Sequence, residues 1–293
     1  MTPDNTDVSR RGLLGLASGA VAIASIPGGA FAATPSPEQL FTTEAGKGRN
    51  VMLLHGWTAD GHDWSWQLPV LETRYRTVVV DLRGHGRSPV PPSGQYLPAD
   101  YVVDIEALIA DRYKGERFIL IGHSMGGQIA ARLSAQRPDL IEAVVSVDGS
   151  LGFAEDTASL FGKVSHDLYA GDPAIVAPAL FENVYDKATP AALRRWHGRR
   201  VQGVPAHVVR ESFGPLFVGP DQVGTGSQSE HFLRSLNTPV YHLCRDPEQA
   251  RRMRPWFSHP ASKVDAWDHT GHWIMQDHPD EVNAAMTAWI DQI

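Results

Sequence analysis

Runs of apolar residues alternate with segments of helical periodicity over most of the chain. The runs with the length and composition of buried strands are residues 51–54, 76–81, 118–121, 143–148, 239–244 and 263–267. Apolar positions at helical spacing fall between them, at residues 64–71, 101–109, 128–133, 249–256 and 280–290. This alternation predicts an α/β fold, in which a mostly parallel sheet carries helices on both faces.

The alternation stops between residues 151 and 236. This segment has no strand pattern, and prolines and glycines separate its helical and aromatic patches. Because it is too long for a plain loop, we expect it to carry helices of its own. We therefore predict one domain over residues 33–293 with a helical cap insertion at about 151–236. The aromatic content of the insertion favours a small-molecule substrate that is mostly apolar.

The first 32 residues are predicted to be a signal peptide rather than part of the fold. Arg10 and Arg11 form a twin-arginine pattern, a weakly apolar stretch follows at residues 13–26, and Ala-Phe-Ala at 30–32 fits a cleavage site. The apolar stretch is short for a membrane span and is broken by glycines, although an uncleaved anchor is the alternative. The pattern predicts export by the twin-arginine machinery to the periplasm or the medium.

Composition narrows the classes of function. The 293 residues are 42% hydrophobic and 20% charged, which suits one large soluble domain or two small ones. A net charge of -7 without a basic run argues against nucleic acid as a partner. The single cysteine, Cys244, leaves no disulfide within the chain, and no Cys/His cluster has zinc-site spacing. Phosphate-loop and dinucleotide-binding glycine motifs are absent from the sequence, so we expect neither a cofactor nor a metal.

The strongest chemical signal is Gly-His-Ser-Met-Gly at residues 122–126. An apolar strand run precedes it and a helical pattern follows, and this is the context in which G-x-S-x-G presents a nucleophilic serine on a sharp turn. We expect Ser124 at the tip of the turn, with glycines at 122 and 126 because strand and helix approach closely there. The alternative is an ordinary serine in a glycine-rich turn.

A serine hydroxyl needs a base to accept its proton, and the base belongs where the strands end. His272 lies directly beyond the last strand run, and His269 is the competitor. The oxyanion needs two backbone N–H donors. We expect them from Met125, which follows the serine, and from Trp57, in the loop after the first strand run.

Together these motifs resemble the α/β-hydrolase fold family. Its motifs occur in the family's order: His-Gly at 55–56, Asp-x-Arg-Gly-His-Gly-Arg-Ser at 81–88, Gly-His-Ser-Met-Gly-Gly at 122–127 and Gly-His at 271–272. The resemblance implies a parallel sheet with a cap inserted after the strand that follows the nucleophile's helix, where residues 151–236 fall. Two departures stand out. The short segment before residue 51 implies fewer leading strands, and the acid of the triad is not at its commonest place.

Three carboxylates are candidates for that acid. Asp148 ends the strand run after the nucleophile's helix, at the expected catalytic edge. Asp246 and Glu248 follow the next strand run, the commoner location in the family, but the usual Gly-x-x-Asp turn is missing there. Arg-Asp-Pro-Glu at 245–248 reads equally well as a helix start, with Asp246 as its N-cap. We favour Asp148.

The resulting hypothesis is an exported serine hydrolase that cleaves a carboxylic ester, lactone or related acyl bond through Ser124, His272 and Asp148. The alternative keeps the fold and changes the reaction to perhydrolase or haloperoxidase chemistry, carbon–carbon bond hydrolysis or cofactor-free dioxygenation. Residues 244–249 and 255–257 loosely resemble the last group. A serine at 124 argues against epoxide hydrolases and dehalogenases, which have aspartate there. A non-catalytic binding module is the third class, and the substrate itself is not identified.

Overall fold

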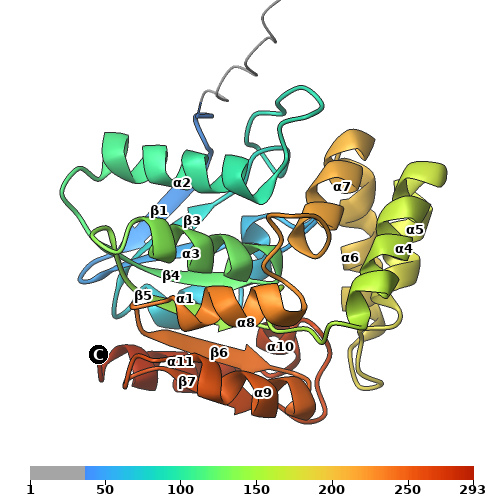
Figure 1. Ribbon diagram of the computed structural model, residues 1–293. Coiled ribbons are helices and arrows are strands. Elements are labelled where there is room, and N and C mark those ends of the chain that lie inside the picture. The colour runs from blue at the N-terminus through green and yellow to red at the C-terminus, as the bar shows by residue number, and fades with distance from the viewer. Residues whose placement is uncertain (1–36) are drawn as a thin grey trace, which may run out of the picture. The chain divides into compact units, whose positions relative to one another are not determined.

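A computed structural model describes residues 37–293, which form a seven-stranded sheet with helices on both sides (Figure 1). The strand order is β1-β3-β2-β4-β5-β6-β7. Their bounds are Thr42–Gly46, Asn50–Leu54, Arg76–Val80, Phe118–His123, Ile141–Val147, Val240–Cys244 and Lys263–Ala266 for β1 to β7. Every neighbouring pair is parallel except β1 with β3. The predicted α/β fold with a mostly parallel sheet is confirmed.

The edge strand β1 was not predicted, for a physical reason. Its sequence Thr-Thr-Glu-Ala-Gly is exposed over most of its length, because β1 pairs with β3 on one side only. An exposed edge strand needs no apolar run. In contrast, all six residues of β4 are buried. A strand that is buried on both faces has a continuous apolar sequence, and β4 could be predicted for that reason.

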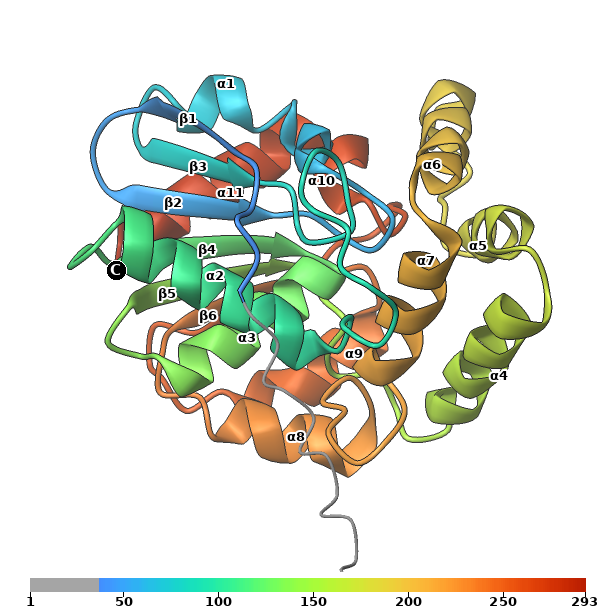
Figure 2. The same ribbon diagram turned by 90° about the horizontal axis from the view of Figure 1, so that it is seen from above.

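Helices cover both faces of the sheet. The helices outside the long insertion are α1 (Leu68–Leu71), α2 (Pro98–Arg112), α3 (Met125–Gln136), α9 (Pro247–Met253), α10 (Ile274–Asp277) and α11 (Pro279–Ile290), with 3-10 turns η1 (Gly61–Trp64) and η3 (Arg254–Trp256). Figure 2 shows α2, α3 and α9 on one side of the sheet and α1 and α11 on the other. Because strands β2 to β7 are parallel, their carboxyl ends share one edge of the sheet, where the following loops can meet.

The insertion between β5 and β6 is helical, as predicted. It contains α4 (Thr157–Ala170), α5 (Pro173–Phe181), α6 (Ala191–Gly203), α7 (Ala206–Phe213), η2 (Gly214–Leu216) and α8 (Gly226–Arg234). Helices α4 to α6 stand beyond the carboxyl ends of the strands, whereas α8 lies against the sheet near α9 (Figures 1 and 2). The function of residues 151–236 as a cap stays a prediction.

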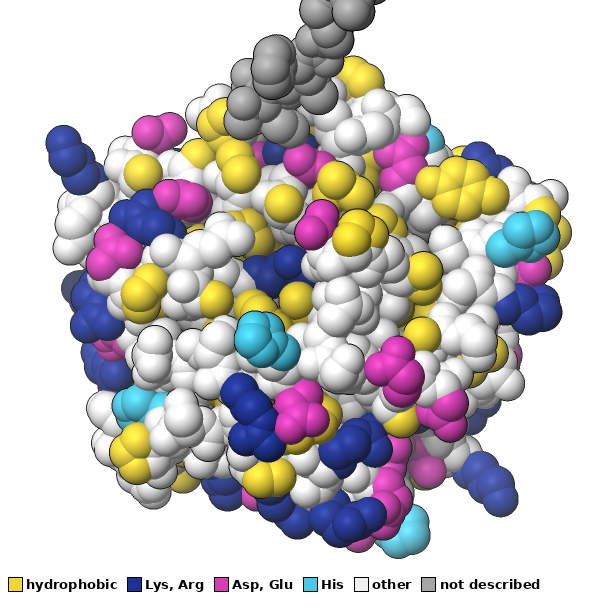
Figure 3. Space-filling view, in the orientation of Figure 1, with side chains coloured by type: hydrophobic (Ala, Val, Ile, Leu, Met, Phe, Trp, Pro, Cys, Tyr) yellow, Lys and Arg dark blue, Asp and Glu magenta, His cyan; other side chains and the backbone are white. Residues whose placement is uncertain are grey.

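The remaining sequence expectations concern targeting and partners. The predicted signal peptide at residues 1–32 lies outside the described residues. From residue 37 onward, no helix combines the length and apolar character required to span a bilayer. The face drawn in Figure 3 intermixes basic and acidic side chains. The expectation that nucleic acid is not a partner stays a prediction.

Candidate active site

Ser124 occupies the turn between β4 and α3 in a backbone conformation that few residues other than glycine adopt. Its φ is 51° and its ψ is -116°. An added Cβ at Gly122 would lie 2.3 Å from the Gly126 carbonyl oxygen, and one at Gly126 would lie 2.3 Å from that of Leu54. The glycines allow this close approach because they have no Cβ. The surrounding packing holds Ser124 in its strained backbone conformation, which costs on the order of 1–3 kcal/mol. The predicted strand–turn–helix context is confirmed.

His272 contacts Asp148 by a short hydrogen bond. The His272 Nδ1–H group donates to Asp148 Oδ2 at 2.6 Å. Asp148 directly follows β5, and the loop that carries His272 follows β7, so parallel strands deliver both residues to the same edge of the sheet. The bond fixes the ring tautomer and leaves Nε2 as the proton acceptor. Among the described residues, neither this Nε2 nor the Ser124 hydroxyl has a hydrogen-bond partner, although both residues line one cavity.

The carboxylate of Asp148 is buried yet charged. Burial alone would raise its pKa, but the hydrogen bond from His272 and the positive charge of Arg245 outweigh burial and hold the pKa well below its usual range. Arg245 Nε donates to Asp148 Oδ2 at 2.9 Å, and its backbone N–H donates to Oδ1 at 3.1 Å. Asp148 therefore remains an anion beside the His272 ring at neutral pH.

The other candidates for acid and base lie elsewhere. Asp246 is the N-cap of α9, with its Oδ1 accepting from the Glu248 N–H at 2.9 Å. Glu248 pairs with Arg251 at the surface. His269 is exposed, and its carbonyl accepts a hydrogen bond from His278. Of the three carboxylates, the structure brings Asp148 to His272.

The two N–H groups expected to bind an oxyanion belong to segments next to Ser124. Met125 begins α3, and Trp57 follows β2. Within residues 37–293, neither backbone N–H donates a hydrogen bond. A Cβ added at Gly56 would lie 3.2 Å from the Ser124 Cβ, so the Trp57 loop passes directly beside the serine. The Trp57 indole Nε1 donates to the Val209 carbonyl at 3.1 Å, which ties this loop to α7.

A cavity of about 80 Å³ opens beside Ser124 and His272. Its wall is mostly apolar and is formed by Trp57, Phe153, Phe161, Leu180, Phe181, Val184, Phe213, Leu216 and Phe217, with Ser150 and Arg245 as further polar residues. Most of these aromatic side chains come from the insertion. In the described part of the chain, no group of three or more His, Cys, Asp or Glu side chains is placed to hold a metal ion.

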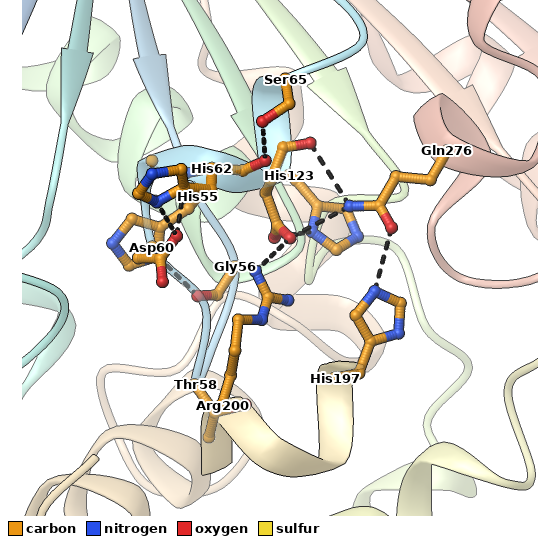
Figure 4. Close-up of polar contacts among 12 residues, drawn as sticks. His55, Gly56, Thr58, Asp60, His62, Ser65, His123, His197, Arg200 and Gln276 are labelled. Atoms are coloured by element: carbon orange, nitrogen blue, oxygen red, sulfur yellow. Dashed lines mark hydrogen bonds and ion pairs between the residues drawn. The ribbon is translucent and has the colours of Figure 1, made fainter. Parts of the chain in front are cut away.

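A buried polar network behind the site was not predicted. The Asp63 Oδ1 atom pairs with Arg200 Nη1 of α6 and accepts from Gln276 Nε2 at 3.0 Å. Gln276 Oε1 lies 2.9 Å from His197 Nε2. Figure 4 marks this contact with a dashed line. Asp63 is fully buried and the Arg200 side chain is 9% exposed. The network thus joins the insertion to η1 and to α10, which follows the His272 loop. No local sequence feature marks Asp63 as buried.

His123 connects this network to the base. Its Nε2–H donates to the His272 carbonyl at 3.0 Å, and its Nδ1 lies 3.9 Å from Asp63 Oδ2. Burial, with a smaller contribution from the neighbouring His272, lowers the pKa of His123 to about 3. His123 is therefore neutral at ordinary pH. The His272 backbone N–H also donates to the Val184 carbonyl at 2.8 Å, so the base loop is held from the core and from the insertion.

The order of the elements and the position of the serine turn agree with a known family. The family model described as alpha/beta hydrolase fold matches residues 49–226. The chain belongs to the alpha/beta hydrolase fold family.

Relatives in this family include esterases and other hydrolases. The chain is 32% identical over 105 residues to the pimeloyl-[acyl-carrier protein] methyl ester esterase of Aeromonas hydrophila, covering 36% of this chain and 39% of that one. It is 24% identical over 268 residues to the 2-hydroxy-6-oxo-6-(2'-aminophenyl)hexa-2,4-dienoic acid hydrolase of Metapseudomonas resinovorans, covering 85% and 86%. A thermophilic esterase from Thermogutta terrifontis has a similar fold, with a TM-score of 0.74, 22% identity and coverage of 89% and 96%. The first curated relatives are matched over only 31–39% of their length.

Proposed function

We propose that the protein is a serine hydrolase that cleaves a carboxylic ester, lactone or related acyl bond through an acyl-enzyme on Ser124. The observation that carries this proposal is the 2.6 Å hydrogen bond from His272, which lines one cavity together with Ser124, to the buried side chain of Asp148. A nucleophile, a base and a group that orients the base are the minimum for acyl transfer to serine.

The steps follow from these groups. His272 Nε2 accepts the Ser124 proton as the serine oxygen bonds to the carbonyl carbon, and the imidazolium is stabilised by the Asp148 charge. The same proton then passes to the leaving alcohol as its bond to the acyl carbon breaks. Water enters, gives a proton to His272 and attacks the acyl carbon, and the acid product leaves as Ser124 regains its proton.

The charge that develops on the substrate oxygen also needs donors. The backbone N–H groups of Trp57 and Met125 have no acceptor among residues 37–293 and can serve this purpose, and each such donor contributes roughly 10²- to 10³-fold to turnover. Because Trp57 also lines the cavity, its loop both shapes the pocket and supports the oxyanion. The apolar wall favours an acyl group or alcohol with few polar atoms.

Hydrolysis of short p-nitrophenyl esters tests the proposal. Ser124→Ala and His272→Ala should each lower kcat by about four to six orders of magnitude, with far-ultraviolet circular dichroism unchanged. Ser235→Ala, a surface serine outside the cavity, is the control and should retain full activity. Turnover of esters by Ser124→Ala at the native rate would refute the assignment.

A second candidate is hydrolysis of an oxo-dienoic acid by the same residues. It is favoured by the relative from Metapseudomonas resinovorans, which aligns with most of this chain. Ultraviolet absorbance of a 6-oxo-hexa-2,4-dienoate substrate would decay in the presence of the enzyme if this reaction occurs. Decay of the dienoate without any ester hydrolysis would favour this candidate over the first.

We also propose export by the twin-arginine pathway, on the basis of Arg10, Arg11 and the Ala-Phe-Ala sequence at residues 30–32. Replacing both arginines by lysine should retain the precursor inside the cell, as judged by fractionation and mass. Normal amounts of the shortened protein outside the cytoplasm would contradict this route.

A further inference from the structure

One part of the otherwise apolar cavity carries polar donors that the chain itself does not use. Arg245 is the single Lys, Arg, Asp or Glu among the described residues that line the cavity. Its Nε and backbone N–H are bonded to Asp148, but Nη1 and Nη2 have no hydrogen-bond partner in residues 37–293. The Ser150 hydroxyl, which also lines the cavity, has none there either, although the residue is 3% exposed.

The free edge of Arg245 has a definite chemistry. A guanidinium is a planar fork that pairs with a carboxylate through two parallel N–H···O bonds. Asp148 accepts from the Nε atom, and the two terminal nitrogens have no acceptor in the described part of the chain. The cavity that Arg245 lines has a mostly apolar wall, and the lower dielectric there strengthens an ionic hydrogen bond relative to one in water.

The position of Arg245 also limits where an anion would lie. Asp148 Oδ2 accepts from both His272 Nδ1 and Arg245 Nε, so the guanidinium and the imidazole are neighbours around one carboxylate oxygen. Ser150 is two residues beyond Asp148, and its backbone N–H donates to the Ser124 carbonyl at 3.0 Å. These donors therefore lie beside the base, close to the nucleophile, rather than at the far end of the cavity.

We propose that the substrate is an acyl compound that carries a carboxylate a short distance from the scissile carbonyl, and that Arg245, assisted by Ser150, binds this carboxylate. This inference rests on the proposed acyl hydrolysis and names its substrate class. Half-esters of short dicarboxylic acids are the simplest members of that class. In this role Arg245 determines specificity in addition to holding Asp148 in place.

Paired substrates separate the two roles of Arg245. Mono-p-nitrophenyl esters of succinic, glutaric and adipic acid are compared with the same esters in which the free carboxylate is capped as a methyl ester. Any effect that Arg245→Gln exerts through Asp148 acts on both members of a pair, so the ratio of their kcat/KM values isolates recognition of the carboxylate. Arg245→Gln should lower this ratio by ~10- to 100-fold, mainly through a higher KM for the half-ester, because a charge-assisted hydrogen bond is lost.

Two further variants sharpen the comparison. Ser150→Ala should lower the ratio in the same direction but less, because it removes one neutral donor. Arg251→Gln is the matched control, since Arg251 lies on α9 at the surface and pairs with Glu248 rather than facing the cavity. It should leave the ratio at the wild-type value. A ratio that Arg245→Gln leaves unchanged, or a wild-type enzyme that prefers the capped esters, would overturn the proposal.

A binding measurement keeps this inference separate from the proposed function. Glutarate binding to the full-length protein is measured by isothermal titration calorimetry, with glutaramide as the neutral comparison. Glutarate binding that Arg245→Gln abolishes, in a protein that cleaves no ester, would support the carboxylate site and refute the hydrolase proposal. Cleavage of neutral esters without glutarate binding would support the hydrolase proposal and refute the carboxylate site.

Discussion

Replacing Asp63 by asparagine tests whether the buried ion pair between η1 and α6 stabilises the folded protein. The substitution keeps the shape of the side chain and removes its charge, which leaves Arg200 in a position where its side chain is 9% exposed. Removing one partner of a buried pair costs about 3–5 kcal/mol, because the remaining charge is no longer compensated. For a domain of this size, that corresponds to a decrease in Tm of about 6–20 °C.

The pH dependence of the effect follows from the pKa of Asp63. Burial would raise this pKa, but the positive charge of Arg200 and its hydrogen bond to the carboxylate outweigh burial and lower it. A carboxyl group whose pKa is depressed on folding contributes stability above its unfolded pKa, and that stability is lost as the pH falls through the folded value. The difference between the wild type and Asp63→Asn should therefore be complete at pH 7 and should shrink below about pH 4.

Urea unfolding followed by tryptophan fluorescence, at pH 7 and at pH 3, measures both effects. Glu248→Gln is the matched control, because it breaks a pair with Arg251 in which both side chains are more than two-thirds exposed. It should change the free energy of unfolding by no more than about 1 kcal/mol. Adding Arg200→Met to Asp63→Asn should recover part of the loss. If Asp63→Asn is as mild as the surface control at pH 7, the reasoning about the buried pair is wrong.

Three further changes probe the turn, the insertion and the start of α9. Gly126→Ala places a Cβ against the backbone of β2 and should prevent soluble expression, whereas Gly203→Ala, which has open space around it, should melt at or slightly above the wild-type temperature. Phe181→Ala enlarges the cavity and should raise the kcat/KM ratio of long to short acyl esters by roughly tenfold, whereas an equal loss for all esters would mean misfolding. Asp246→Asn should retain full ester hydrolysis and lose at most about 1 kcal/mol of stability, and a nearly inactive variant would move the acid to β6.

The sequence predicted best those features that depend on the residues of a single element or on the direction of the strands. Buried parallel strands need continuous apolar runs, so six of the strands were located, whereas the exposed β1 carries no such run. The meeting of His272 with Asp148 was also predictable, because the carboxyl ends of parallel strands share one edge of the sheet. The helical content of the insertion followed from its length and its helical patches.

The parts that could not be predicted depend on tertiary partners. Asp63 follows the loop after β2, but its burial depends on Arg200 and Gln276, which lie far away in the sequence. Arg245 stands in an Arg-Asp-Pro-Glu segment that indicates only a helix start, and its contact with Asp148 arises because β5 and β6 are neighbours. Helical periodicity likewise does not specify which helices of the insertion pack beside Ser124.

Mass spectrometry of a trapped adduct tests the central claim most directly. The protein is treated with a fluorophosphonate, digested, and searched for phosphonylated peptides, with Ser150 as a second serine in the same cavity. Nucleophilic activation by His272 predicts a single phosphonyl group on Ser124, much slower labelling in His272→Ala, and none in Ser124→Ala. A phosphonyl group on Ser150, or undiminished labelling of Ser124→Ala, would contradict the assignment of Ser124 as the nucleophile.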